Sequence, residues 1–407
     1  MKILIEYECS QCGAPAVLEE TDRLFACEYC RVKSYLFNKD FFQYVLPSEA
    51  SDSKDLFLMP YWRFKGMLFS CVDKSIEHKF IDVSYQAVES NAFPVSVGLR
   101  SQALKLKFIT PDLKGYFVKP QLSFQSVMNI FMKRFSDPAN DVIQYQAHVG
   151  ETISIIYSPF YIDKKLYDAV LNEPIGPKLP DEFDILKMPG GKPEWSLKFI
   201  PTLCPHCGWD LNGERDALVL ICTNCISAWI PSAKGLKQIN FACMKRELNN
   251  TVYFPFWRIK ADISGIQLAS YADLVRVANL PKAIQKGWDK IDFYFWVPGF
   301  KVRPKTFLRL LSQTTTAQPM DELKTQLPDE KIFPVTLPAE EAVETLKINL
   351  ASFIKNDTLL DNLPQIKIKP KNLFLAFIPF QESHHDYVQP EYQISINKNQ
   401  ILLSNNL

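Results

Sequence analysis

Eight of the ten cysteines have the spacing of metal ligands, because they form four Cys-x-x-Cys pairs. The pairs group into a first and a second cysteine set, whose members are Cys9, Cys12, Cys27 and Cys30, and Cys204, Cys207, Cys222 and Cys225. One Cys-x-x-Cys turn presents two thiolates to an ion, and two turns complete the tetrahedral shell that Zn²⁺ prefers. In each set, 14 residues separate the two pairs, which suits a connecting β-hairpin. We therefore predict two zinc sites with these eight ligands.

Both sites are expected to be structural and not catalytic. Four thiolates close the zinc shell, whereas a catalytic zinc keeps an open position and usually has His or carboxylate ligands. His206 lies inside the second set, but Gln11 occupies the matching place in the first set. We therefore expect the two ions to stabilise the fold, since structural zinc contributes directly to the free energy of folding.

The segments around residues 7–37 and 202–229 resemble the zinc-ribbon family, which includes the small ribbons of transcription factors and rubredoxin-like knuckles. The resemblance implies a small hairpin domain held together by one four-cysteine site. Rubredoxins carry glycine after both Cys-x-x-Cys pairs, whereas Arg31 and Ile226 follow the second pair of each set here. This departure disfavours an iron electron-transfer site.

An internal repeat extends beyond the cysteines. All four ligands of the first set recur 195 positions later, and Gly13 recurs as Gly208. The same step aligns residues 59–65 with 254–260, so that the motif Pro-x-Trp-Arg-x-Lys occurs twice. Weaker matches follow at other offsets, namely 97–100 with 298–301, Phe117 with Phe333, and 157–160 with 377–380. We predict a tandem duplication of one unit, a zinc ribbon followed by a β domain.

The repeat predicts the domain borders. A chain of 407 residues exceeds one ordinary core, so two or three domains are expected. Proline and glycine concentrate between the two copies, which is typical of a linker. The expected order is a zinc ribbon at 1–45, a β-rich domain at 46–173, a linker at 174–195, a zinc ribbon at 196–240 and a β-rich domain at 241–407.

The fold class is predicted to be α+β and β-rich, with helical insertions in the β domains. Alternating or β-branched sequence predicts strands at 80–85, 152–157, 292–297 and 373–378. Apolar residues at helical spacing predict a helix over 123–135. A second helix is expected over 338–354, where a proline and two glutamates open the first turn.

The repeated Trp-Arg-x-Lys motif has two interpretations. Its members are Trp62, Arg63 and Lys65 in the first copy and Trp257, Arg258 and Lys260 in the second. On a strand, the tryptophan faces one side and the two cations face the other. The motif is either a core strand whose cations pair with carboxylates of the ribbon or of a neighbouring strand, or a cationic surface that recognises phosphate, a carboxylate or an acidic tail. The core interpretation is favoured, because buried charges are normally paired.

No other residues predict catalysis. His384 and His385 have no counterpart in the first copy, and adjacent side chains on an extended chain point apart, so we expect an exposed loop and not a metal site. Cys71 and Cys243 fall outside the two sets and are expected to be small buried hydrophobes. The sequence has no phosphate-loop, dinucleotide-binding, zinc-protease or nucleophile-elbow motif.

The charge balance weighs against nucleic acid as a partner, with 46 Lys+Arg against 45 Asp+Glu. Phosphate binding gains from a basic surface, but acidic residues crowd both cysteine sets, although Arg31, Lys33 and Lys39 follow the first. We therefore expect a non-enzymatic, zinc-stabilised scaffold or adaptor that binds other proteins. The alternative is a nucleic-acid-binding protein that acts through the zinc ribbons.

The cysteines and the chain's first residues predict its compartment. Thiolate metal sites are typical of a reducing environment, where disulfides are rare. The first cysteine set begins too early for a secretory leader to precede it, and the most apolar runs are shorter than the ~20 residues of a membrane-spanning helix. We expect a cytoplasmic protein with no membrane span.

Overall fold

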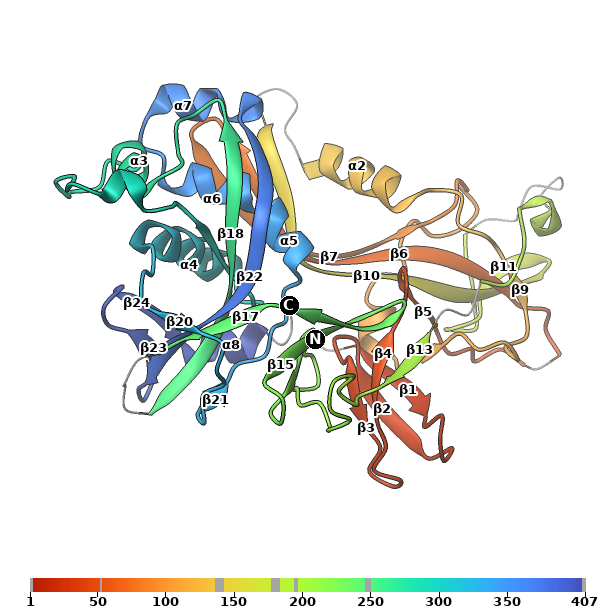
Figure 1. Cartoon of the computed structure of the whole chain (residues 1–407). Helices are drawn as coiled ribbons and strands as arrows, with labels where there is room; N and C mark the ends of the chain where they lie inside the picture. Colours follow the sequence, from red (N-terminus) through yellow and green to blue (C-terminus); the bar gives the residue numbers. More distant parts are fainter. Residues whose placement is uncertain are drawn as a thin grey trace. The chain divides into compact units, whose positions relative to one another are not determined.

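The computed structural model describes residues 3–51, 53–135, 143–176, 184–193, 197–245 and 250–404 (Figure 1). Most of the regular structure consists of β-strands, and the helices are short. The predicted α+β, β-rich fold class is therefore confirmed. None of the helices in the described ranges is long and apolar enough to cross a membrane.

The chain divides into two compact units, which we call unit 1 and unit 2. Unit 1 comprises Met1–Lys65, Asp82–Ala139 and Thr152–Pro201, and unit 2 comprises Gly66–Ile81, Asn140–Glu151 and Thr202–Leu407. Each unit contains one cysteine set. Parts of the predicted linker at 174–195 lie outside the described residues, and the domain borders stay a prediction.

The main sheet of unit 1 contains two long strands, β6 (Phe57–Val72) and β10 (Ile143–Asp163), parts of which belong to unit 2. Along one path the order is β12 (Glu173–Pro174), β11 (Lys165–Asp168), β10, β5 (Phe42–Val45), β8 (Leu106–Phe108), β1 (Leu4–Glu8) and β2 (Pro15–Glu19). Strand β6 pairs with β10, β7 (Ser75–Gln86) and β9 (Tyr116–Phe117). The helical segments are α1 (Arg100–Ala103), α2 (Phe124–Phe135) and the 3-10 helix η1 (Ile185–Lys187).

A second, three-stranded sheet in unit 1 joins segments that are far apart in the sequence. Its strands are β3 (Leu24–Ala26), β4 (Lys33–Phe37) and β13 (Lys198–Pro201). Strand β13 pairs with β4 in antiparallel register, with Phe199 opposite Leu36. Phe199 also stacks on Tyr7, with ring centroids 5.4 Å apart. The sheet that carries Cys27 and Cys30 is therefore completed by residues that directly precede the second cysteine set.

Unit 2 contains an eight-stranded sheet in which β18 and β22 lie side by side (Figure 1). The order along one path is β19 (Phe295–Pro298), β18 (Thr251–Ser264), β22 (Lys367–Glu382), β17 (Phe241–Met244) and β20 (Leu323–Lys324). Strand β21 (Lys331–Ile332) pairs with β18, and the hairpin β23 (Asp386–Gln389) and β24 (Ile394–Asn397) pairs with β22. A separate sheet holds β14 (Leu220–Cys222), β15 (Ser227–Ser232) and β16 (Gly235–Ile239) beside the second cysteine set.

Unit 2 also contains short helices, some of which pack on strands of its sheet. They are α3 (Tyr271–Val277), α4 (Pro304–Ala317), α5 (Ala339–Glu344), α6 (Leu346–Phe353), α7 (Asp357–Asp361) and α8 (Lys398–Ser404), with 3-10 helices η2 (Trp288–Lys290) and η3 (Leu363–Gln365). Helix α4 packs on β19 and on α6, and α5 and α8 also pack on strands of the sheet. The segments of unit 2 that come from the first half of the chain join the same core, where Phe69 contacts Phe307 with ring centroids 5.7 Å apart.

The predicted helices are confirmed, with one break. The helix expected over 123–135 is α2, and the helix expected over 338–354 is divided into α5 and α6 by Thr345. Glu340 and Glu341 lie in the first turn of α5, as expected for side chains that face the positive end of a helix dipole.

Three of the four predicted strands are confirmed, within β7, β10 and β22. The fourth, expected over 292–297, begins only at Phe295. The difference has a local cause. The Tyr294 N–H donates to Gln318 Oε1 at 3.2 Å, and the Gln318 amide donates back to the Tyr294 carbonyl. The Gln318 side chain therefore occupies the backbone N–H and carbonyl of Tyr294, which are the groups that a neighbouring strand would otherwise hydrogen-bond.

Matching strands in the two units have matching neighbours. Strand β5 runs parallel to β10, and β17 runs parallel to β22. Strand β9 runs parallel to β6 with Phe117 opposite Leu58, and β21 runs parallel to β18 with Ile332 opposite Tyr253. Leu58 and Tyr253 are 195 positions apart, so the sheet register places Phe117 and Ile332 opposite residues that the repeat would match, one position from the sequence match of Phe117 to Phe333.

Both motif tryptophans are core residues. Trp62 is 5% exposed and Trp257 is 1% exposed. Each indole N–H donates to a backbone carbonyl at a similar distance, 2.8 Å from Trp62 to Leu122 and 2.9 Å from Trp257 to Leu337. The indole groups therefore fill the core while their polar atoms stay satisfied, which is the usual requirement for a buried tryptophan.

Replacing either core tryptophan by alanine should lower the free energy of unfolding by about 3–5 kcal/mol, because a large cavity forms and a carbonyl loses its donor. The matched control is Trp209→Ala, since Trp209 is 58% exposed, and the expected change there is within about 0.5 kcal/mol. Denaturant unfolding would measure all three variants. A Trp62→Ala or Trp257→Ala variant as stable as the parent chain would contradict the assignment of that side chain to the core.

Candidate functional site

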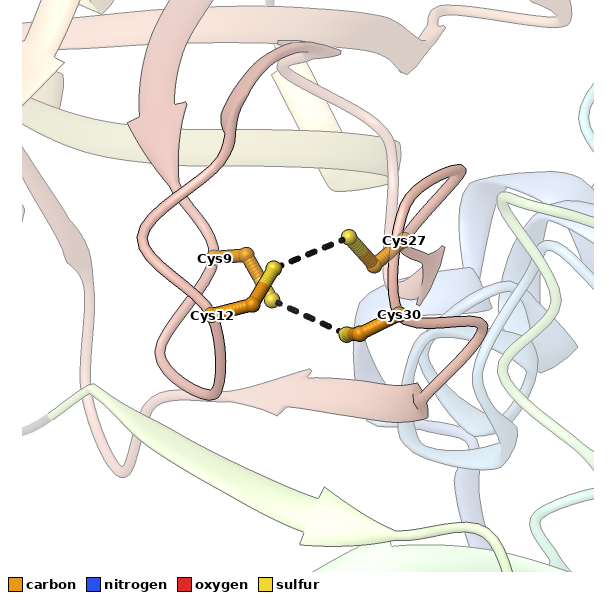
Figure 2. A group of neighbouring side chains, drawn as sticks. All are labelled: Cys9, Cys12, Cys27 and Cys30. Atoms are coloured by element: carbon orange, nitrogen blue, oxygen red, sulfur yellow. Dashed lines mark hydrogen bonds between the residues drawn. The ribbon is translucent and has the colours of Figure 1, made fainter.

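The first cysteine set is assembled by two turns that face each other (Figure 2). Cys9 and Cys12 follow β1, and Cys27 and Cys30 lie between β3 and β4. The Sγ atoms of Cys9 and Cys30 are 3.8 Å apart, and those of Cys12 and Cys27 are 3.7 Å apart. A tetrahedron with Zn–S bonds of ~2.3 Å has sulfur–sulfur edges of about 3.8 Å, so the four thiols have the spacing of a metal shell.

The second cysteine set has the same arrangement, between the chain that follows β13 and the turn joining β14 to β15. The Sγ atoms of Cys204 and Cys225 are 3.5 Å apart, as are those of Cys207 and Cys222. In each set, all four sulfur atoms lie within 4.8 Å of one another. The eight predicted residues are thus brought together in two groups of four, each of which could hold a metal ion.

The backbone of the turns is the same in both sets. Gly13 and Gly208, after the first pair, both have φ of +71°. Arg31 and Ile226, after the second pair, have φ of +59° and +52°. The left-handed conformation is uncommon for any residue with a side chain and is a strong outlier for a β-branched one. Ile226 therefore shares the left-handed conformation of Gly208 in the other turn of its set, against the local preference of a β-branched residue.

A hydrogen-bonded chain supports the second set and was not anticipated from the sequence. The Trp229 indole N–H donates to Ser227 Oγ at 2.8 Å, and Ser227 Oγ lies 3.0 Å from Cys225 Sγ. Groups behind the ligands orient them and tune the site. Val32 and Ser34 occupy the matching positions of the first set, so these hydrogen bonds from Trp229 through Ser227 are found only at the second set.

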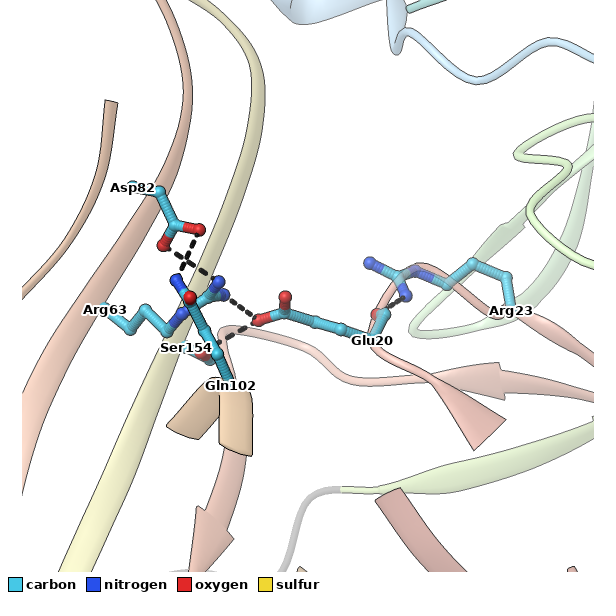
Figure 3. Close-up of polar contacts among 6 residues, drawn as sticks. All are labelled: Glu20, Arg23, Arg63, Asp82, Gln102 and Ser154. Atoms are coloured by element: carbon cyan, nitrogen blue, oxygen red, sulfur yellow. Dashed lines mark hydrogen bonds and ion pairs between the residues drawn. The ribbon is translucent and has the colours of Figure 1, made fainter. Parts of the chain in front are cut away.

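A buried ion network surrounds Arg63 and ties the first ribbon to β6 (Figure 3). Arg63 is 1% exposed, and its guanidinium pairs with Glu20 and with Asp82, the latter at 3.0 Å. Glu20 follows β2, within the hairpin between the two Cys-x-x-Cys turns, and Asp82 lies on β7. Ser154 and Gln102 add hydrogen bonds to Glu20 and Asp82. Arg63 is therefore paired with one carboxylate of the ribbon and one of the neighbouring strand, as the core interpretation predicts.

The other motif cations have different surroundings. Lys65 is 4% exposed, and burial lowers the pKa of its ammonium group, although Glu20 partly opposes this shift. Lys260 pairs with Asp292 at 2.6 Å. Arg258 has no carboxylate partner among the described residues and is flanked by aromatic rings. The core interpretation thus accounts for Arg63, whereas Lys260 forms an exposed ion pair with a carboxylate outside the strands and Arg258 stays open.

The remaining candidates from the sequence lie apart from the cysteine sets. His384 and His385 are exposed in the turn between β22 and β23, and in the described ranges they belong to no group of potential metal ligands. Cys71 and Cys243 are buried, and burial raises the pKa of each thiol to about 12. These two cysteines are therefore buried and un-ionised at neutral pH, as predicted.

A buried carboxyl group, Glu341, and a half-buried one beside it, Glu151, were missed by the sequence analysis, which treated Glu341 only as a residue of a helix's first turn. Glu341 is 8% exposed and accepts backbone hydrogen bonds from Gly150 and Glu151. Burial raises the pKa of Glu341 to about 8, with Lys301 opposing and Glu151 reinforcing the shift. Burial likewise raises the pKa of Glu151 to about 7, with a further contribution from Glu344.

Comparisons with known proteins add no family assignment. No protein-family model matches the chain, and neither curated proteins nor solved structures show significant similarity to it. The resemblance to zinc ribbons therefore rests on the cysteine spacing and the thiol geometry described above.

Replacing Cys27 or Cys222 by serine should remove one metal ion per chain from a total of two, because each change breaks one four-thiol group. Elemental analysis of the purified protein would give the count and identify the metal. The matched control is Cys243→Ala, a buried cysteine outside both sets, which should leave the count unchanged. A chain that contains iron, or that holds fewer than one ion, would refute the zinc assignment.

The stability of unit 2 should depend on pH through Glu341. Its pKa is raised on folding, so the folded chain binds more protons than the unfolded chain between pH 4.5 and about 8. The free energy of unfolding should therefore fall as the pH rises through this window. Denaturant unfolding at several pH values should show a weaker dependence for Glu341→Gln, while Glu340→Gln, which alters an exposed neighbour, should keep the parent slope. If Glu341→Gln kept the parent's pH dependence of the free energy of unfolding, the raised pKa of Glu341 would be contradicted.

Proposed function

We propose that this chain is a non-enzymatic, zinc-stabilised scaffold or adaptor that binds other proteins. The observation that carries the proposal is the exposure of three apolar side chains that adjoin or lie close in sequence to the ligands of the second cysteine set. Leu203 is 53% exposed, Trp209 is 58% exposed and Ile226 is 42% exposed. Large aromatic side chains of this kind are enriched in protein interfaces and dominate their binding energy.

The cysteine geometry fixes the positions of these side chains. Leu203 directly precedes Cys204, and the Cys204 N–H donates to the Trp209 carbonyl at 2.7 Å. Ile226 directly follows Cys225 in the left-handed conformation. An ion held by the four thiols would keep all three side chains in place, so metal binding and presentation of this surface are coupled.

Zinc is the proposed metal at both sites. Soft thiolates select zinc or iron–sulfur centres, and a closed shell of four thiolates is typical of structural zinc. A reducing cytoplasm is the compartment in which eight such thiolates stay available. The duplication is part of the same proposal, and it is supported by the matching turn conformations, the matching strand neighbours and the two equivalent indole hydrogen bonds.

The surface on the second set has no equivalent on the first. Glu8, Ala14 and Arg31 stand at the positions that match Leu203, Trp209 and Ile226. The first set instead exposes Tyr29, which is 71% accessible. We therefore assign a stabilising role to both sites and the main protein-binding role to the second.

Affinity capture from the native host, with the purified chain as bait, would test the proposal. The parent chain should retain specific proteins after nuclease treatment, and Trp209→Ser should lose them while keeping its zinc and its stability. The matched control is Leu99→Ser, because Leu99 is 74% exposed and belongs to unit 1, whereas Trp209 belongs to unit 2. If Trp209→Ser captured the same proteins as the parent chain, the assignment of protein binding to this surface would be wrong.

Nucleic acid would be tested in parallel by fluorescence anisotropy with DNA and RNA. We expect no binding tighter than about 1 µM at physiological salt, because few phosphates can be neutralised by a chain whose charges cancel. Tight binding that weakens steeply with salt, and that is lost when Arg31 and Lys33 are changed to Glu, would favour nucleic-acid binding through the first ribbon instead.

A further inference from the structure

The two cysteine sets share a backbone but differ in side chains behind the ligands. The Gly13 N–H donates to the Cys9 carbonyl at 2.8 Å, and the Gly208 N–H donates to the Cys204 carbonyl at the same distance. Three matching positions carry different side chains, namely Gln11, Val32 and Ser34 in the first set and His206, Ser227 and Trp229 in the second. These positions can make the two metal sites unequal even though their turns have matching backbones.

The serine and the tryptophan of the second set lie on one face of β15. They are two positions apart on this strand, so their side chains point to the same side. Ser227 is 2% exposed and Trp229 is 4% exposed. The pairing of β15 with β14 sets Ser227 opposite Cys222, one of the four ligands. The sheet register therefore fixes the serine hydroxyl beside the thiols and away from water.

The hydrogen bonds of this pair have a defined direction once the cysteines are ligands. The indole Nε1 of Trp229 is only a donor, so Ser227 Oγ accepts from it at 2.8 Å. A metal-bound cysteine is a thiolate and carries no hydrogen of its own. The Ser227 hydroxyl hydrogen is therefore available to sulfur, with Cys225 Sγ at 3.0 Å and Cys204 Sγ at 3.8 Å. Cys225 receives the shorter of these contacts, which is charge-assisted and shielded from water.

The same indole also contacts the opposite turn of the second set. The rings of Trp229 and His206 meet edge to face, with their centroids 5.0 Å apart. His206 lies between Cys204 and Cys207, whereas Cys225 belongs to the other turn. One side chain thus packs against the first turn and, through the serine, hydrogen-bonds to a ligand of the second. Bracing both turns reduces the conformational freedom that the ligands lose when an ion binds.

We propose that Ser227 and Trp229 are positioning residues that make the second site hold its metal ion more tightly than the first. The hydroxyl offsets part of the negative charge that four thiolates leave around a divalent cation, and it fixes the direction of Cys225 Sγ. Val32 offers no side-chain donor at the matching position of the first set. Partners behind metal ligands typically contribute roughly 10- to 100-fold in metal affinity. The inference rests on the proposed zinc sites and adds an order of release, in which the first site loses its ion before the second.

Site-resolved zinc occupancy of the full chain provides the test. The zinc-loaded protein would be equilibrated in chelator buffers of graded free zinc concentration. A short pulse of iodoacetamide would then label the cysteines that hold no ion, and mass spectrometry would report the two cysteine sets separately. In the parent chain, the second set should be half-occupied at a free zinc concentration at least about tenfold lower than the first set.

Variants at the serine isolate the contribution of its hydroxyl. Ser227→Ala should raise the half-occupancy concentration of the second set by about 10- to 100-fold and leave the first set unchanged. Because this change leaves the buried Trp229 N–H without an acceptor, the double variant Ser227→Ala with Trp229→Phe removes that donor as well and should show the same shift. Ser227→Thr, which keeps the hydroxyl, should stay close to the parent. The matched control is Val32→Ala, which should move neither set.

Cobalt(II) in place of zinc gives a readout that a purely structural role would not move. A hydrogen bond lowers the energy of the thiolate electrons, so its loss should move the sulfur-to-cobalt charge-transfer band to longer wavelength. This displacement should occur in Ser227→Ala and in the double variant, and should be absent in Val32→Ala.

Several results would overturn the inference while leaving zinc at both sites. They are an unshifted second set in the double variant, an equal shift of both sets, an unmoved cobalt band in Ser227→Ala, and a parent chain whose first set holds zinc as tightly as the second. A parent chain with no zinc on the second set would overturn this inference and the proposed zinc site together.

Discussion

Four thiols held within 4.8 Å of one another set the main physical constraint on this chain. Thiolates at that separation repel one another strongly unless a cation lies between them. The turns that carry them also place residues with side chains, Arg31 and Ile226, in left-handed backbone. The geometry of both sets is therefore one that could hold a metal ion.

The rest of unit 1 depends on the first ribbon through charge as well as through packing. Glu20 reaches from the ribbon hairpin to Arg63, whose guanidinium is almost fully buried. Removing one member of such a pair leaves an uncompensated buried charge, which is far more destabilising than the pair is stabilising. In unit 2, Arg258 is flanked by aromatic rings, and its buried Nε has no hydrogen-bond partner among the described residues.

The cysteine spacing was enough to predict which thiols meet, because metal coordination depends on short turns and a fixed ligand geometry. The fold class, the two helices and the burial of both tryptophans also followed from local patterns and from the repeat. The pairing of β13 with β4 could not be foreseen, since strand pairing across the chain leaves no mark on the local sequence. The same limit applies to Glu341, which looks like an ordinary first-turn acid until Gly150 and Glu151 are found against it. The late start of β19 depends on Gln318, a side chain more than twenty residues away.

The position of β13 has a consequence for the order in which the chain can fold during synthesis. Strand β4 cannot pair with β13 until about 160 further residues have been synthesised, because Phe37 pairs with Lys198. During that interval one edge of the first ribbon is open to other strands, and open edges are where chains aggregate or exchange segments. A metal ion taken up early by Cys9, Cys12, Cys27 and Cys30 would hold the hairpin together through this delay. Zinc supply during translation would then govern the yield of correctly folded protein as well as its final stability.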